Sequence, residues 1–165
     1  MNFKMLKSFN IFVTCFKGIS VFHSSGKYLR SFGKLGSNRG QFDKPYYVHV
    51  DRANHVLVSD CSNHRIQVFD SKGVFLNTFG TEGSNLGQLK HPRGITTDKE
   101  GFILVADSGN SRIQVFHPGD YSYVTHFGSS GTESGKFRGL EGIAINPKNG
   151  DVIICDKENH RVQIL

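Results

Sequence analysis

Three near-copies of one ten-residue phrase dominate this sequence. They begin at Asp60, Asp107 and Asp156, 47 and 49 residues apart, and read DCSNHRIQVF, DSGNSRIQVF and DKENHRVQIL. A Phe-Gly pair recurs at nearly the same spacing ahead of each phrase, at 32–33, 79–80 and 127–128. Similarity at a fixed period of this length is the mark of repeat architectures, in which each repeat is one supersecondary unit. The chain is therefore predicted to be built from repeated units.

Each complete unit contains four short runs in which apolar and polar residues alternate, as in half-buried strands. In one unit these runs are GITTD (94–98), FILVAD (102–107), RIQVF (112–116) and SYVTHFG (122–128). Four antiparallel strands per unit are typical of a propeller blade. We therefore predict an all-β fold, a partial β-propeller of about three and a half blades. The predicted divisions are a degenerate first blade (1–40), two blades (41–87 and 88–135) and a blade truncated in its third strand (136–165).

The motifs resemble the NHL repeat, named for an Asn-His-Leu element. Asn63-His64-Arg65-Ile66 and Asn159-His160-Arg161-Val162 stand at that element, and the likeness extends over roughly residues 19–165. NHL propellers have six blades as a rule, so the resemblance implies an open arc with two exposed edges. The remaining blades of a propeller, or another chain, are expected to cover these edges.

The recurring turn residues favour a structural interpretation. Asp and Asn side chains bond nearby backbone amides in turns, and an Arg at the start of the next strand can pair with the Asp. The residues assigned to these turns are Asp60, Asn63, Arg65, Asp107, Asn110, Arg112, Asp156, Asn159 and Arg161. The His of the phrase is replaced by Ser111 in the middle copy, so the turn does not need it. His64 and His160 are thus free to contact a ligand.

A modest basic bias lies on one predicted face. The loops that join the blades (33–47, 80–94 and 128–142) hold seven Lys/Arg against four Asp/Glu. The predicted ligand-binding residues on this face are Lys44, Tyr46, His64, Lys90, His91, Arg93, Arg138 and His160. Basic and aromatic groups together suit the phosphates and bases of single-stranded RNA. A protein-docking face is an equal alternative, and Glu141 weakens the RNA interpretation in the last blade.

The bulk charge adds little to the RNA interpretation. The net charge is +6, with +7 in residues 1–40 and −1 in the remainder, so the excess does not follow the repeats. No His-x-x-x-His or His-x-Glu spacing and no nucleophile motif appears, so we predict no catalytic residue, no metal and no cofactor. A metal-dependent propeller enzyme, lyase-like or lactonase-like, is the alternative. It requires three or more His, Glu or Asp side chains to converge at the axis.

Cysteine usage and hydropathy predict the compartment. Cys15, Cys61 and Cys155 lie far apart, which fits a reducing environment and not the paired cysteines of an extracellular NHL scaffold. No apolar run reaches the roughly 20 residues that a membrane span needs, so a cytoplasmic location without a membrane partner is expected. The repeats most resemble the C-terminal propeller of tripartite-motif (TRIM-NHL) proteins. That resemblance implies a non-catalytic recognition module for RNA stem-loops or proteins. Any ubiquitin-ligase activity would reside in a RING domain absent here.

Overall fold

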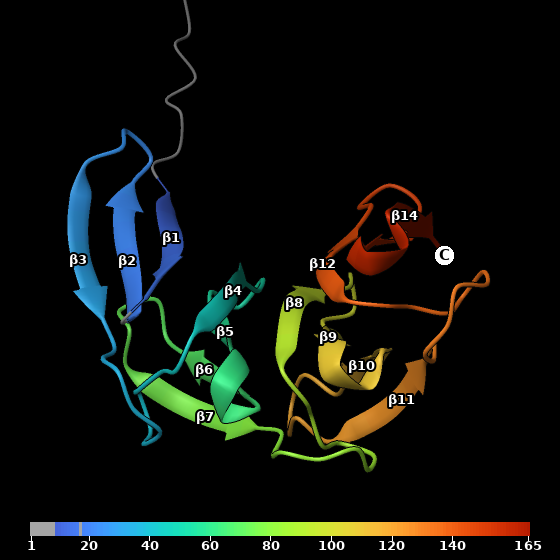
Figure 1. Cartoon of the computed structure of the whole chain (residues 1–165). Helices are drawn as coiled ribbons and strands as arrows, with labels where there is room; N and C mark the ends of the chain where they lie inside the picture. Colours follow the sequence, from blue (N-terminus) through green and yellow to red (C-terminus); the bar gives the residue numbers. More distant parts are fainter. Residues whose placement is uncertain (1–8, 17) are drawn as a thin grey trace, which may run out of the picture.

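The computed structural model describes residues 9–16 and 18–165 of the chain. These residues form fourteen strands and three short 3-10 turns, and the strands make four separate antiparallel sheets. The sheets stand side by side around an arc, with β4, β8 and β12 toward its middle and β3, β7 and β11 toward its outside (Figure 1). The predicted all-β class and the partial propeller are confirmed.

The sheets have three, four, four and three strands in order along the chain. The first contains β1 (Asn10–Cys15), β2 (Gly18–His23) and β3 (Tyr28–Phe32). The second contains β4 (Pro45–Val50), β5 (Val56–Asp60), β6 (Arg65–Phe69) and β7 (Phe75–Phe79). The third contains β8 (Pro92–Thr97), β9 (Ile103–Asp107), β10 (Arg112–Phe116) and β11 (Tyr123–Phe127), and the fourth contains β12 (Leu140–Ile145), β13 (Val152–Asp156) and β14 (Arg161–Ile164). The 3-10 turns η1 (Cys61–Asn63), η2 (Ser108–Asn110) and η3 (Lys157–Asn159) follow the second strand of the last three sheets.

The hydrophobic core consists of layers between neighbouring sheets. Between the second and third sheets, Leu57 and Ile66 from one side meet Ile95 and Val105 from the other, and all four are nearly inaccessible to solvent. The inner sheets are thus covered on both faces. This explains why every residue of β5 and of β9 is buried, in place of the alternation seen in a sheet with one wet face.

Each loop between two sheets inserts one apolar side chain into the layer that follows it. Phe42 is fully buried and lies directly over Gly33, where an added Cβ would be 2.4 Å from the Phe42 ring. Gly33 also has φ +86°, in the left-handed region that glycine favours. The same pairing recurs as Leu89 over Gly80 and Phe137 over Gly128. The recurring Phe-Gly pair of the sequence therefore makes room for the next loop.

The two end faces of the arc lack such a cover among the described residues. Val162 and Ile164 on β14 are 60% and 64% exposed, whereas Ile113, at the repeat position of Val162, is fully buried. At the other end, Phe9 is 63% exposed and Val13 is 43% exposed. Apolar residues of the type that form the internal layers therefore face outward at both ends.

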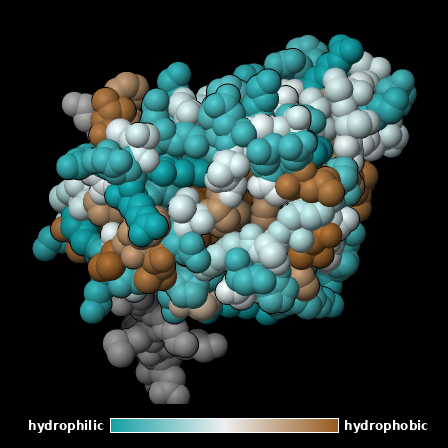
Figure 2. Space-filling view, turned by 90° about the horizontal axis from the view of Figure 1, so that it is seen from below, coloured by the Kyte–Doolittle hydropathy of each residue, from teal (hydrophilic) through white to brown (hydrophobic). Residues whose placement is uncertain are grey.

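The outer side of the arc is different in character. Seen from below, its surface is mostly hydrophilic, with separate hydrophobic patches (Figure 2). The outer strands also carry exposed apolar residues, such as Leu76 on β7 and Val124 on β11. Within the described part of the chain, no helix has the length and apolar character needed to cross a membrane.

Candidate functional site

The Asp-Asn-Arg turns grip the loop that precedes their own sheet. Asp60 is fully buried at the end of β5, and its Oδ2 accepts from Arg65 Nε at 2.8 Å. Its Oδ1 accepts from the backbone N–H of Asp43, 17 residues earlier, at 2.8 Å. Asn63 Nδ2 donates to the carbonyl of Gly36 at 2.9 Å, and Arg65 Nη2 donates to the carbonyls of residues 38 and 41. We expected the Asp60 carboxylate to bond the backbone amides of its own turn, but it makes no such cap. It binds the upstream loop instead.

A buried glutamine completes this cluster, and the sequence interpretation gave it no role. Gln67 Nε2 donates to Asp60 Oδ2 at 3.0 Å and to the carbonyl of Gln41 at 2.6 Å, while Gln67 Oε1 accepts from Gly40 N–H at 2.9 Å. Every polar atom of the Gln67 amide thus has a partner, as burial requires. A Gln at the same position of all three phrases was the signal available in the sequence.

We call this arrangement the loop clamp, and it occurs three times. Its members are Asp60, Asn63, Arg65 and Gln67; Asp107, Asn110, Arg112 and Gln114; and Asp156, Asn159, Arg161 and Gln163. In the last copy, burial alone would raise the pKa of Asp156. Hydrogen bonds from Arg138 N–H, Asn159, Arg161 and Gln163 outweigh burial and lower that pKa. The clamp of the fourth sheet therefore holds Asp156 as an ionised carboxylate within the fold.

The variable residue of the phrase ends each 3-10 turn in the left-handed backbone region. His64, Ser111 and His160 have φ values of 55°, 53° and 51°. The backbone conformation is the same whichever side chain is present, so the turn does not depend on the imidazole. This agrees with the way His and Ser alternate between the copies.

Part of the predicted binding face does come together, in a cavity of about 460 Å³ at the beginnings of β4, β8 and β12. We call it the loop-face cavity. Four of the predicted ligand-binding residues line it, namely Lys44, Tyr46, His91 and Arg93. Residues that sequence reasoning did not assign also line it, among them Cys61, Lys157 and Glu158. The cavity is thus formed by inner-strand residues together with the turns η1, η2 and η3.

Arg93 lines the loop-face cavity, but its charge is neutralised by an ion pair. Its guanidinium lies 4.7 Å from the centre of the Tyr46 ring, a cation–π arrangement. The same group forms an ion pair with Glu141, and Lys157 Nζ lies 3.3 Å from the same carboxylate. Glu141 therefore neutralises cations of this face by direct ion pairs, which its position in the sequence did not indicate.

His64 and His91 pack together beside the cavity. The centroids of their rings are 4.4 Å apart, and the His91 backbone N–H donates to His64 Nδ1 at 3.1 Å. Burial, and next the nearby His64 ring, lower the pKa of His91. Burial also raises the pKa of the Cys61 thiol, against the opposing effect of Arg93. Both groups are therefore neutral near pH 7.

The remaining predicted residues do not line the loop-face cavity. The Lys90 side chain is exposed and lies against Gly109, and Arg138 is exposed on the loop before β12. His160 is exposed at the end of η3. These three residues stand on the surrounding surface.

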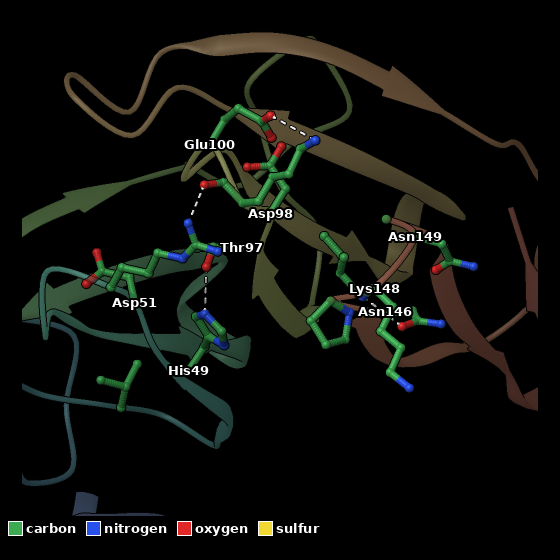
Figure 3. A pocket seen from close by; sticks show the side chains of 14 residues that line it. His49, Asp51, Thr97, Asp98, Glu100, Asn146, Lys148 and Asn149 are labelled. Atoms are coloured by element: carbon green, nitrogen blue, oxygen red, sulfur yellow. Dashed lines mark hydrogen bonds and ion pairs between the residues drawn. The ribbon is translucent and has the colours of Figure 1, made fainter.

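A second cavity of about 520 Å³, which the sequence did not predict, lies at the opposite ends of the same inner strands. We call it the hairpin-face cavity, because the turns after β4, β8 and β12 surround it. His49 and Asp51 lie on one side, Asn146 and Lys148 lie on the other, and Asp98 lies between them (Figure 3). The recurrence of Asp, Asp and Asn at positions 51, 98 and 146 was the signal in the sequence.

One histidine anchors a side of the hairpin-face cavity. His49 Nε2 and Thr97 Oγ1 are 2.9 Å apart and share a hydrogen bond between two sheets. Burial lowers the pKa of His49, so its imidazole is neutral near pH 7. It can therefore accept or donate a hydrogen bond at this site but does not add positive charge.

Tyr47 lies across the space between the inner strands. A Cβ added to Gly142, two sheets away, would be 3.2 Å from the Tyr47 hydroxyl. The residues at the repeat position of Tyr47 are Gly94 and Gly142, so only one of the three sheets places a ring there. Burial raises the pKa of the Tyr47 phenol.

The described residues contain no group of three or more His, Cys, Asp or Glu side chains that could hold a metal ion. Cys15, Cys61 and Cys155 are all free thiols. Cys61 is buried and the other two are exposed, so no disulfide joins these three positions.

The profile of the NHL repeat matches three segments, residues 47–69, 89–116 and 137–165. Each segment lies within one of the last three sheets or begins in the loop before it. The chain contains NHL repeats. The predicted NHL resemblance is thus confirmed, but these matches do not distinguish tripartite-motif proteins from others that carry the repeat. No curated protein sequence matches the chain significantly.

Solved structures place the NHL chain among β-propellers. A streptogramin B lyase matches with a TM-score of 0.71 at 15% identity, over 94% of this chain and 47% of that one. A virginiamycin B lyase from Staphylococcus aureus matches with a TM-score of 0.69 at 13% identity, over 94% and 48% of the two chains. An auxiliary nutrient binding protein from Bacteroides thetaiotaomicron matches with 0.65 at 16% identity, over 93% and 44%. The chain therefore spans about half the length of these proteins, and at such identities the likeness shows the fold alone.

The prediction that this chain is not an enzyme has to be corrected. Two of the proteins that share its fold are lyases by name, so enzymes are built on this fold. The recurring Asp-Asn-Arg turns explain why those side chains are present, but a structural purpose for them does not exclude catalysis elsewhere. The identities of 15% and 13% do not bring the lyase reaction to this chain.

Proposed function

We propose that these NHL sheets form a recognition module that binds a protein segment rich in carboxylates at the loop-face cavity. The observation that carries the proposal is a set of unpaired cations in and around the loop-face cavity. Lys44, Lys90 and Arg138 are exposed, and none of them forms an ion pair within the described part of the chain. An extended acidic segment could cross the hollow and meet cations contributed by three loops.

The geometry favours a protein partner over RNA. An RNA site needs several cations that are free to neutralise phosphates. Here Arg93 and Lys157 are already paired with Glu141, and Glu158 adds another negative charge to the lining. Tyr46 is 43% exposed, but Arg93 stacks on its ring, so a base would have to displace the guanidinium. A peptide can bind through the remaining cations without breaking these contacts.

The wider context is part of the proposal and is not decided by the fold. The tripartite-motif relationship, a ubiquitin-ligase parent and a cytoplasmic location stay predictions. The outward-facing residues Val162 and Ile164 support a further proposal, that additional blades or another chain pack on this face of the arc. The binding proposal does not depend on which of the two covers it.

The test is fluorescence anisotropy with two labelled probes, a synthetic poly-glutamate peptide and a single-stranded oligouridylate, at a defined salt concentration. The peptide is expected to bind the 165-residue chain, and Lys44→Glu is expected to weaken binding at least tenfold through charge repulsion at the cavity. Lys72→Glu makes the same change of charge in the exposed turn between β6 and β7, outside the cavity lining, and serves as the control.

Two results would count against the proposal. Equal loss of affinity in both variants would mean that the peptide responds to overall charge and not to the loop-face cavity. Tighter binding of the oligouridylate than of the peptide, with the same dependence on Lys44, would replace the protein partner by RNA.

A further inference from the structure

An internal layer of the arc shows how two neighbouring sheets complete each other. Between the second and third sheets, one side of the layer consists of apolar residues of the second sheet, Leu57, Ile66 and Val68. The other side consists of residues of the third sheet, Ile103, Val105 and Phe116. All six side chains are buried, so each set supplies the apolar cover that the other needs.

Each end of the arc carries one of these two sets without the other. At the repeat positions of the first set, the uncovered face of the fourth sheet has Ile153, Val162 and Ile164. At the repeat positions of the second set, the uncovered face of the first sheet has Phe9, Ile11 and Phe22. Ile11 is 39% exposed, whereas Val105 at the same repeat position is fully buried. The two ends therefore match each other as the two sides of an internal layer do.

The first sheet also differs from the others in what can enter its layer. Each later sheet holds an incoming loop with a clamp, in which Asp60, for example, accepts from Asp43 N–H and Gln67 accepts from Gly40 N–H. The first sheet has Val13 and Ser20 at the positions of Asp60 and Gln67, so it offers no carboxylate to such a loop. Its uncovered face therefore fits a sheet that arrives without a joining loop, as a sheet of a separate chain does.

The extent of the arc determines how many copies close a ring. This chain spans about half the length of the propellers that share its fold, and Figure 1 shows the first and fourth sheets on opposite sides of the opening of the arc. A head-to-tail contact gives a ring where its rotation closes and an open filament where it does not. Two arcs of four sheets each make a ring of eight, within the roughly four to eight blades of β-propellers.

We propose that a second copy of this chain covers both end faces. The fourth sheet of each copy packs on the first sheet of the other, so two identical contacts close a two-copy ring. In each contact Val162 and Ile164 of one copy lie against Phe9 and Ile11 of the other, and the burial of these apolar side chains drives association. A dissociation constant of about 10 µM is expected, so at about 1 µM the arcs are separate and their end faces are exposed.

Analytical ultracentrifugation of the 165-residue chain tests the proposal at chain concentrations of about 1 µM and about 200 µM. The mass is expected to rise from that of one chain to that of two chains and to rise no further. A mass of one chain at the higher concentration overturns the proposal. A mass that continues to rise beyond two chains also overturns it, because the contact would then form an open filament.

Variants at the two ends show whether unlike faces meet. Val162→Glu and Ile11→Glu each place a charge on one end, and each is expected to leave single chains at about 200 µM, because every contact in the ring uses both ends. Val124→Glu is the matched control, since Val124 is 47% exposed on the outer strand β11, and it is expected to form the ring like the wild type. Two-chain species that persist in either end variant overturn the proposal, because a contact between like ends needs only one of the two faces.

Both end variants are expected to fold, because Val162 and Ile11 are already exposed in the single arc. Circular dichroism checks this for each variant. Ile164→Glu and Val13→Glu provide a second pair on the same two faces if a variant of the first pair fails to fold, and the same outcomes decide.

Discussion

The first sheet and the three sheets after it have the same antiparallel order but are held to their neighbours differently. The later sheets carry the loop clamp, whereas the first has Val13, Gly18 and Ser20 at the positions of Asp60, Arg65 and Gln67. The first sheet nevertheless forms, and Ile19 and Phe32 pack in its layer against Val56 and Val58. Strand pairing and apolar packing thus suffice for a sheet, and the clamp serves the loop that enters it.

This difference also changes what each sheet can accept on its upstream face. A clamp offers four polar side chains that satisfy the carbonyls and N–H groups of an incoming loop. The first sheet offers apolar residues such as Ile11 and Val13 on that face, so it cannot satisfy a loop of the same kind. Whatever packs there has to do so mainly through apolar contact.

Removing one clamp carboxylate is expected to have the largest effect. Asp107→Ala leaves Arg112, Asn110 and Gln114 without their shared acceptor in a buried site, so the free energy of unfolding should fall by about 3 kcal/mol. Urea denaturation followed by circular dichroism measures the change. Val13→Ala, at the equivalent position of the first sheet, should cost less than about 1 kcal/mol. Equal costs at the two positions would contradict the distinction between the sheets.

A smaller effect is expected from pH. The pKa of Asp156 is lowered in the folded state, so its carboxylate stabilises the fold above the unfolded pKa, near 3.8, and this contribution is lost as pH falls through the folded pKa. Thermal melting between about pH 5 and pH 2 should therefore show a decline in midpoint. That decline should be shallower in Asp156→Asn, which has no carboxylate to protonate. A decline of the same steepness in the variant would assign the acid sensitivity to other groups.

The smallest effect is expected at the uncovered end of the arc. Val162→Ala should change the free energy of unfolding by no more than about 0.5 kcal/mol, because the side chain is already 60% exposed. Ile113→Ala, at the equivalent buried position of the third sheet, should cost about 3 kcal/mol. A cost above about 1 kcal/mol for Val162→Ala would show that the face of β14 is covered in solution.

The repeat in the sequence predicted the architecture well, because its period and its alternation both follow from backbone geometry. Asp60 and Arg65 were placed together correctly, since they flank one short turn. Their bonds to the upstream loop could not be predicted from the sequence, because these bonds join residues 17 to 27 positions apart.

The binding face could be predicted only in outline for a related reason. Lys44 and Arg93 come together from different sheets, and their positions in the loops between blades indicated which face they occupy. The pairing of Arg93 with Glu141, 48 residues later, depends on how two inner strands sit beside each other. The hairpin-face cavity was missed because it forms where the turns of three sheets meet. Phe102 stands where the second sheet has His55, so Asp98 lacks the ring nitrogen that Asp51 has beside it, and only the folded structure shows this.

The ring of Tyr47 gives the sheets an order that the repeat by itself would not require. Repeats are often regarded as interchangeable parts, which can be duplicated, deleted or shuffled. Here the second sheet places the Tyr47 ring at the centre, and the third and fourth sheets leave room for it with Gly94 and Gly142, which have no side chain. Two copies of the Tyr47 sheet would compete for one space, and a ring of only glycine sheets would leave it empty. Any rearrangement of these units by recombination would therefore need a compensating change at the centre.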